Sequence, residues 1–178
     1  LADILAELNT SVLVLTGGEP LLRKDLPEIV EAFTKRGISA RLQTNATLAT
    51  DRRVEALVAA GLKEVTISLD TLDPEKQDYI NDSDGSWMRI MRGLSVFSRH
   101  LPLKGNMSGI NIVVSRRNLA EIAGLIKFTT AIGFYASLIP VHLSGNGSND
   151  ADPEFIVRAN SPGFAFTREE FPLIDSVY

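Results

Sequence analysis

Residues 12–23 read VLVLTGGEPLLR, and this stretch decides the fold. The run Val12–Leu15 is apolar and rich in valine, which is typical of a parallel strand buried on both faces. Pro20 suits the first turn of a following helix, because its missing N–H would be unpaired there. The GGE triplet at 17–19 therefore lies at the carboxyl end of a predicted parallel strand, where α/β folds place their ligands.

Helices and strands are predicted to alternate along most of the chain. The expected strands are 12–16, 38–43, 64–69, 110–114 and 135–141, and the expected helices are 1–8, 25–35, 51–60, 86–100 and 119–132. Strands that alternate with helices of this length indicate right-handed crossovers and a parallel sheet. The sequence therefore predicts an α/β fold.

The last part of the chain has a different composition. Residues 144–163 are rich in Gly, Ser, Asn, Asp and Pro, which is typical of a loop. Thr167 and Glu170 have the spacing of a capping box, so we expect a final helix to begin there. We therefore expect a core at 1–143 and, at 144–178, a loop with the start of a C-terminal helical extension.

Composition excludes several classes of protein. The chain has 178 residues, 44% of them hydrophobic, which is enough to form a globular core. A net charge of −4 argues against a nucleic-acid partner, and no basic stripe is visible in the sequence. No apolar run approaches the roughly 20 residues of a transmembrane helix, and the first residues do not resemble a signal peptide. We expect a cytoplasmic protein without membrane contact.

Cysteine is absent from the sequence. Disulfides, thiolate zinc sites and thiolate-held iron–sulfur clusters are therefore excluded within these residues. His100 and His142 are isolated from each other and from other metal-binding side chains in the sequence. We expect no metal ligand among the 178 residues.

Polar groups follow four of the five predicted strands. They are the GGE triplet, Thr44-Asn45, Ser68 with Asp70, and Ser115-Arg116. Because parallel strands bring their carboxyl ends to one edge, these groups converge on a common pocket.

Glycine lets a ligand approach the backbone closely, and the Glu19 carboxylate accepts hydrogen bonds from an ammonium group. Ser68 and Asp70, two residues apart, share a face and suit a diol. The implied ligand is small, polar and zwitterionic.

Each of these features also has a structural interpretation. Two glycines after a strand commonly form a turn, and a carboxylate at a helix start complements the helix dipole. Asp70 is equally suited to capping the segment that follows it. The pair Arg116-Arg117 is typical of a solvated surface, His142 of a structural histidine, and Trp87 of a core residue. The functional interpretation rests on the joint placement of the groups.

Three segments in order resemble a known family. TGGEPLLR, LQTNATL and VTISLDTLDPEK each follow or contain a predicted strand end, and together they resemble the radical S-adenosylmethionine (SAM) enzymes. The resemblance covers about residues 1–145 and is strongest to the branch that includes the molybdenum-cofactor enzyme MoaA and the peptide-modifying SPASM proteins. It implies a partial (β/α)6 TIM-like barrel of parallel strands, with the first strand and the cluster loop missing from this chain.

The resemblance also implies which residues bind SAM. Gly17, Gly18 and Glu19 match the site of the methionyl ammonium, and Asn45 matches a position that faces the cofactor. Ser68 and Asp70 match polar positions near the ribose and the carboxylate. Val113 and Pro140 lie on the later strands that flank the adenine. Relatives often bind the carboxylate with an arginine where this chain has Tyr79-Ile80-Asn81, and Arg116 is a weaker candidate for that role.

One family motif is absent: the CxxxCxxC loop that holds the [4Fe–4S] cluster. We expect its cysteines upstream of residue 1, because the chain begins inside the helix that precedes GGEP in the family. The parent protein is then expected to cleave SAM reductively at the cluster and to make a 5′-deoxyadenosyl radical. That radical abstracts hydrogen from a peptide or small-molecule substrate, and a flavodoxin or ferredoxin supplies the electron.

Two other hypotheses fit the same residues. One is a cluster-less module that binds a nucleotide or an amino acid on the same barrel, and upstream cysteines would distinguish it from the enzyme. The other is an α/β scaffold with turn glycines only, which predicts no cofactor binding and no effect of Glu19→Ala on any ligand.

Overall fold

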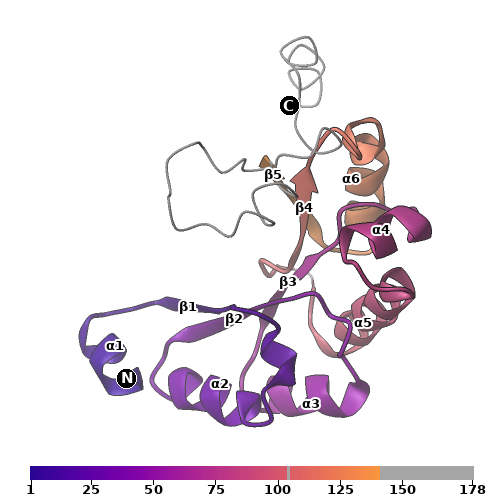
Figure 1. Ribbon diagram of the computed structural model, residues 1–178. Coiled ribbons are helices and arrows are strands. Elements are labelled where there is room, and N and C mark those ends of the chain that lie inside the picture. Colours follow the sequence, from indigo (N-terminus) through magenta and orange to yellow (C-terminus); the bar gives the residue numbers. More distant parts are fainter. Residues whose placement is uncertain (104, 141–178) are drawn as a thin grey trace, which may run out of the picture.

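The computed structural model describes residues 1–103 and 105–140, and these form one parallel sheet covered by helices (Figure 1). The strands are β1 (Val12–Leu15), β2 (Ser39–Thr44), β3 (Glu64–Ser68), β4 (Gly109–Val114) and β5 (Tyr135–Pro140). They lie in the order β1-β2-β3-β4-β5, and every neighbouring pair is parallel. The predicted α/β fold is therefore confirmed.

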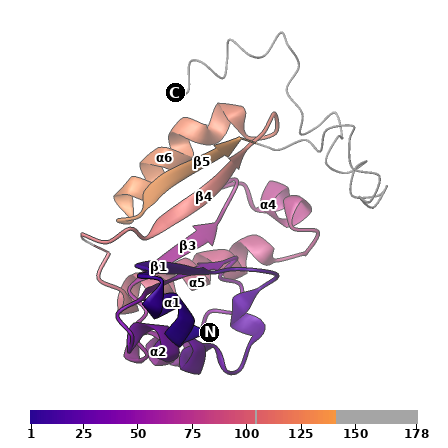
Figure 2. The same cartoon turned by 90° about the vertical axis from the view of Figure 1, so that its left-hand side faces the viewer.

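Helices connect the strands and follow one side of the sheet (Figures 1 and 2). The connecting helices are α2 (Leu26–Thr34), α3 (Asp51–Ala59), α4 (Pro74–Ile80), α5 (Ser86–His100) and α6 (Ile122–Ala131), with short 3₁₀ helices η1 (Pro20–Leu22) and η2 (Leu119–Glu121). Helix α1 (Ala2–Glu7) precedes β1. A sheet whose strands follow sequence order, joined by right-handed crossovers, places all its connecting helices on one face. Among the described residues, these connecting helices leave the opposite face of the sheet uncovered.

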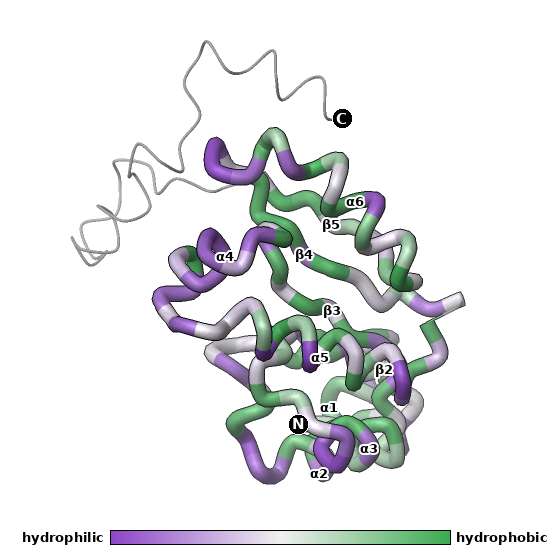
Figure 3. The backbone as a smooth tube through the Cα atoms, turned by 90° about the vertical axis from the view of Figure 1, so that its right-hand side faces the viewer, coloured by the Kyte–Doolittle hydropathy of each residue, from purple (hydrophilic) through white to green (hydrophobic). Residues whose placement is uncertain are grey.

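The core lies between the sheet and these helices. Alternate residues of β2, β3 and β4 face the helices, among them Leu42, Ile67 and Ile112, each with no exposed area. Helix α5 contributes Phe97 and helix α6 contributes Leu125, which are also fully buried. Burial of each such side chain stabilises the fold by about 1.5–3 kcal/mol. In Figure 3 the strands β3 and β4 are mostly hydrophobic, whereas α4 is mostly hydrophilic.

The prediction that β1 is buried on both faces is wrong. Val12 and Val14 are 47% and 45% exposed, while Leu13 and Leu15 are partly buried. β1 pairs with β2 alone among the described strands, so it forms an edge of the sheet as the structure describes it. An apolar sequence therefore indicated the strand correctly and its burial incorrectly.

Helix α4 was not predicted. Its N-cap is Asp73, whose Oδ1 accepts hydrogen bonds from the N–H groups of Glu75 and Lys76, and Pro74 occupies the first turn. Asp-Pro followed by polar helix formers is a start signal, but the seven residues have too few apolar positions for a helical pattern. The predicted loop and helix at 144–178 lie outside the described residues.

Within the described part of the chain, each helix is too short or too polar to cross a membrane.

Candidate ligand site at the strand ends

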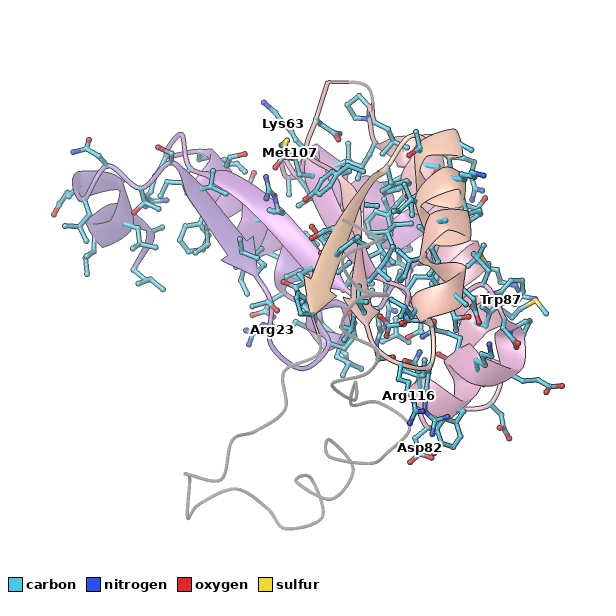
Figure 4. All side chains as sticks on the ribbon, turned by 90° about the horizontal axis from the view of Figure 1, so that it is seen from above. Arg23, Lys63, Asp82, Trp87, Met107 and Arg116 are labelled. Atoms are coloured by element: carbon cyan, nitrogen blue, oxygen red, sulfur yellow. The ribbon has the colours of Figure 1, made fainter. Side chains whose placement is uncertain are left out.

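The carboxyl ends of the strands form one rim of the molecule. Figure 4 shows Arg23, which follows the GGEP segment, and Arg116, which follows β4, at one end of the sheet. Lys63 and Met107, which precede β3 and β4, lie at the other end. The polar groups that the sequence placed after the strands therefore share the rim where α/β folds bind ligands.

Gly17 and Gly18 form an open loop on this rim, and both are exposed. Gly17 has φ +141°, a conformation that L side chains rarely adopt. Gly18 has no such φ, and a Cβ added to it would meet no atom of the described residues within 4 Å. Within the described chain, the carbonyl groups of both glycines accept no hydrogen bond. The loop thus offers two free acceptors and space beside them, which fits a ligand ammonium.

Glu19 is bound by the protein itself. Its Oε1 accepts hydrogen bonds from the N–H of Leu21 at 2.9 Å and from the Thr44 hydroxyl at 2.6 Å. Its Oε2 accepts one from the N–H of Asn45 at 2.9 Å. The carboxylate therefore caps η1 and joins the end of β1 to the end of β2. In this conformation Glu19 holds the glycine loop in place, and any contact with a ligand is additional to that role.

Asn45 begins a tight turn after β2. Its Oδ1 accepts hydrogen bonds from the N–H of Thr47 at 3.0 Å and from the Thr47 hydroxyl at 2.8 Å. Ala46, the next residue, is fully buried with φ +58°. Both the side chain and the N–H of Asn45 are thus engaged in the local structure, although Asn45 is partly exposed on the rim.

Asp70 follows β3 and lies beside β4. Its Oδ1 accepts a hydrogen bond from the N–H of Val113 at 2.6 Å, and the described residues provide no other partner for the carboxylate. Burial raises the pKa of Asp70 to about 6, and the Val113 hydrogen bond opposes that rise. A carboxyl group with this pKa changes charge near neutral pH and has one oxygen available to a ligand.

Two buried amides fix the loops around Asp70, and sequence reasoning missed both. Asn118 donates from Nδ2 to the carbonyls of Asp70 and Val113, at 2.7 and 2.9 Å, and accepts from Ser115. Gln77 accepts from the N–H groups of Asp70 and Thr71. Each amide is 1% exposed. Gln77 bonds residues six and seven positions before it, and Asn118 bonds Ser115 and Val113 nearby in sequence, whereas its bond to Asp70 spans 48 positions and had no local signal.

Near the carboxyl ends of β3, β4 and β5, the helix-free face of the sheet carries uncharged polar side chains, whereas the Arg41–Glu64 ion pair lies on the same face at the start of β3. The register places Ser68, Asn111 and Ser137 in one row across β3, β4 and β5. All three are partly buried, and their side chains form no hydrogen bond within the described residues. The next row toward the strand starts holds Gly109 and Tyr135, and a Cβ on Gly109 would lie 2.5 Å from the Tyr135 ring. The ring therefore covers Gly109 and forms a floor below the row.

The remaining candidates are less well placed. Val113 is 37% exposed and shares the helix-free face with Ile139, its partner on β5. Pro140 is the next residue along β5, so it belongs to the opposite face, and the structure does not bring it to the same surface as Val113.

Arg116 is exposed two residues after β4. Arg117 lies over the Tyr79 ring, 4.5 Å from its centroid.

A metal site is not formed by the described residues: no group of three or more His, Cys, Asp or Glu side chains could hold an ion there. The whole sequence also contains no cysteine. These 178 residues therefore contain no thiolate ligand for an iron–sulfur cluster.

Comparison with known proteins identifies the family. Residues 1–129 match the radical SAM superfamily. The chain belongs to this superfamily. Radical SAM enzymes use SAM and a [4Fe–4S] cluster, so this chain belongs to a family of enzymes.

Among curated relatives of this radical SAM chain, an AdoMet-dependent heme synthase of Methanosarcina barkeri is 33% identical over 156 residues, which is 85% of this chain and 43% of that protein. GTP 3′,8-cyclase 1 of Mycobacterium tuberculosis is 32% identical over 167 residues, 90% of this chain and 45% of that protein. The chain thus spans less than half the length of these relatives.

A solved structure described as native anSMEcpe with bound AdoMet and Kp18Cys peptide superposes with a TM-score of 0.62. The match covers 84% of this chain and 44% of the chain in the solved structure, at 18% sequence identity. At this identity the likeness shows the fold alone, and it agrees with the partial barrel expected from the sequence.

Proposed function

We propose that the protein to which this chain belongs cleaves SAM reductively and uses the 5′-deoxyadenosyl radical to abstract hydrogen from a substrate. The observation that carries the proposal is the open Gly17-Gly18 loop, whose carbonyl groups accept no hydrogen bond within the described chain. A [4Fe–4S] cluster, held by cysteines outside these 178 residues, supplies the electron for the cleavage.

In this proposal each part of the rim has a task. The carbonyls of Gly17 and Gly18 accept hydrogen bonds from the methionyl ammonium, and Glu19 keeps their loop in position. Ser68 and the second oxygen of Asp70 hydrogen-bond the ribose, while Asn45 and Val113 border the cofactor. Arg116 and Pro140 were also expected to contact SAM, and the face that Pro140 occupies makes it the weakest of these candidates.

We further propose that the substrate lies against β4 and β5. Asn111 and Ser137 provide donors and acceptors there, the Tyr135 ring provides a floor, and the described residues of β4 and β5 are all uncharged. Such a surface suits a neutral group that both donates and accepts, as a peptide amide does. This favours a peptide or an uncharged part of a small molecule, with a flavodoxin or ferredoxin as reductant in the cytoplasm.

The proposal assigns residues 1–143 to the radical SAM core and 144–178 to a C-terminal extension. The experiment that tests the function is anaerobic reconstitution of the full-length protein with iron and sulfide, followed by a dithionite assay for 5′-deoxyadenosine. We expect product that requires SAM, the cluster and Glu19. Binding of SAM without a cluster and without product would contradict the enzyme and favour a binding module, which the absence of cysteine from these residues also allows.

A further inference from the structure

The turn after β2 is held in a strained conformation. Ala46 has φ +58° and is fully buried. The left-handed region is unfavourable for a non-glycine residue, so surrounding contacts must hold it there. The N–H of Ala49 donates to the Ala46 carbonyl at 3.1 Å within the turn, and two further contacts come from helix α5 and from the end of β2.

Helix α5 touches this turn at Gly93, which is buried in the middle of the helix. A Cβ on Gly93 would lie 2.2 Å from the carbonyl oxygen of Ala46 and 2.8 Å from its Cβ. Glycine normally weakens a helix interior relative to alanine. Here it lets the backbone of α5 approach the turn directly, so the turn has no room to move toward the helix.

The Thr44 hydroxyl holds the turn from the other side. Thr44 is 3% exposed, and its Oγ1 accepts a hydrogen bond from the N–H of Ala46 at 2.9 Å. The same Oγ1 lies 2.6 Å from Oε1 of Glu19. Since an ionised carboxylate only accepts, the single hydroxyl proton of Thr44 must be directed at Glu19. Thr44 therefore couples the turn to the carboxylate that holds the glycine loop.

We propose that Gly93 and Thr44 are positioning residues for the cofactor loop. The chain of contacts runs from Gly93 to Ala46, from Ala46 to Thr44, and from Thr44 to Glu19. Glu19 in turn bonds the N–H groups of Leu21 and Asn45 and so sets where residues 17 and 18 present their carbonyls. The effect on SAM affinity rests on the proposed function, whereas the mechanical link to the loop does not.

The first test is Gly93→Ala in the full-length protein. The added methyl must push the Ala46 turn away from α5, because its nearest neighbours are backbone atoms. We expect the dissociation constant for SAM, measured by calorimetry on the reconstituted protein, to rise about tenfold, equivalent to about 1.4 kcal/mol. The matched control is Gly124→Ala on α6, where a Cβ meets nothing within 4 Å of the described residues and SAM affinity should not change.

The second test separates the hydroxyl from the bulk of Thr44. Thr44→Val keeps the shape but removes the hydrogen bonds to Glu19 and Ala46, and it should weaken SAM binding about tenfold. Thr44→Ser keeps the hydroxyl and should restore affinity to within about twofold of wild type. Thr129→Val is the control, because Thr129 is also fully buried but bonds only the Ile126 carbonyl of its own helix.

A third readout does not depend on SAM at all. The N–H groups of Leu21 and Asn45 donate to Glu19, so their hydrogen exchange in the cofactor-free protein reports how firmly that carboxylate is held. We expect exchange about tenfold faster in Gly93→Ala and Thr44→Val, and unchanged in Gly124→Ala and Thr129→Val.

The outcomes of these tests are distinguishable. Unchanged exchange at both amides in Gly93→Ala and Thr44→Val would overturn the positioning role. The same holds if Thr44→Ser behaves like Thr44→Val. Faster exchange with unchanged SAM affinity would confirm the link to the loop and contradict the placement of SAM on it, which is a failure of the proposed function.

Discussion

Two carboxylates on the same rim, Glu19 and Asp70, have opposite environments. Glu19 accepts three hydrogen bonds from two neighbouring segments and joins β1 to β2. Asp70 accepts one, from the N–H of Val113, and burial raises its pKa to about 6. Both were expected to be ligand groups from sequence position alone.

The two carboxylates differ in the number of donors aimed at them, and for Asp70 burial is the larger influence on the pKa. A carboxylate with three donors is a fixed anion and a structural link between strands. A partly buried carboxylate with one donor is poorly compensated, so it takes up a proton more readily and keeps an oxygen for another partner. We therefore expect substitutions at Glu19 to act on the fold first, and those at Asp70 to act through charge.

The largest effect is expected for Glu19→Ala, which leaves the donors of Leu21, Thr44 and Asn45 without their acceptor. At about 1 kcal/mol for each lost bond, the free energy of unfolding should fall by about 3 kcal/mol. Urea unfolding of the cofactor-free full-length protein measures it. Glu28→Ala on the exposed face of α2 is the control and should change stability by less than about 0.5 kcal/mol. Equal effects of the two substitutions would contradict the structural role of Glu19.

A smaller effect, of opposite sign, is expected for Asp70→Asn. The asparagine keeps an oxygen for the N–H of Val113 and removes the buried charge, so stability at pH 8 should rise by about 2 kcal/mol. Because the pKa of Asp70 is raised by folding, the native state holds more protons than the unfolded state between about pH 4 and 6. The contribution of Asp70 to the free energy of unfolding therefore becomes less favourable as the pH rises through that range.

This pH dependence provides the control for Asp70→Asn. At pH 4 the carboxyl group is largely protonated in the native state, so wild type and variant should have similar unfolding free energies. The gap between them should open by pH 6.5 and then stay constant. A gap that is already complete at pH 4, or a variant that is less stable at pH 8, would show that Asp70 is not the poorly compensated group described here.

The smallest effect on stability is expected for Ser68→Ala. The Ser68 hydroxyl has no hydrogen-bond partner within the described residues, so the free energy of unfolding should change by less than about 0.5 kcal/mol. SAM affinity should nevertheless fall, because Ser68 is placed next to the ribose in the proposed site. Thermal unfolding together with calorimetry checks both parts. A stability loss above 1 kcal/mol, or an unchanged affinity, would remove Ser68 from the site.

The fold was largely predictable from sequence because its signals are local. The apolar runs and the helical spacings identified all five strands and most helices, and Gly37, Gly61 and Gly133 end their helices with positive φ as glycine allows. The exposure of Val12 and Val14 was not predictable, since it depends on which strands flank β1. Helix α4 was missed because it is short and polar.

The rim position of the candidate site residues was predictable, but the hydrogen-bond network around them was not. Strand-end position indicated Gly17, Gly18 and Asp70, and the structure places them on one rim. Several contacts in this network join residues 25 to 48 positions apart, such as Thr44 with Glu19 and Asn118 with Asp70. No local pattern reports such pairs. The strained turn at Ala46 and its support at Gly93 were invisible for the same reason.

The central claim is that the glycine loop exists to receive SAM, and Gly18→Ala tests it most directly. At Gly18 neither φ nor any described neighbour requires glycine, so the substitution should leave thermal unfolding within about 1 °C of wild type. The methyl group would occupy space that the proposal gives to the ligand. We predict that SAM binding to the reconstituted full-length protein, measured by calorimetry, falls at least about tenfold. Unchanged SAM affinity would contradict the account and leave residues 17 and 18 as a turn.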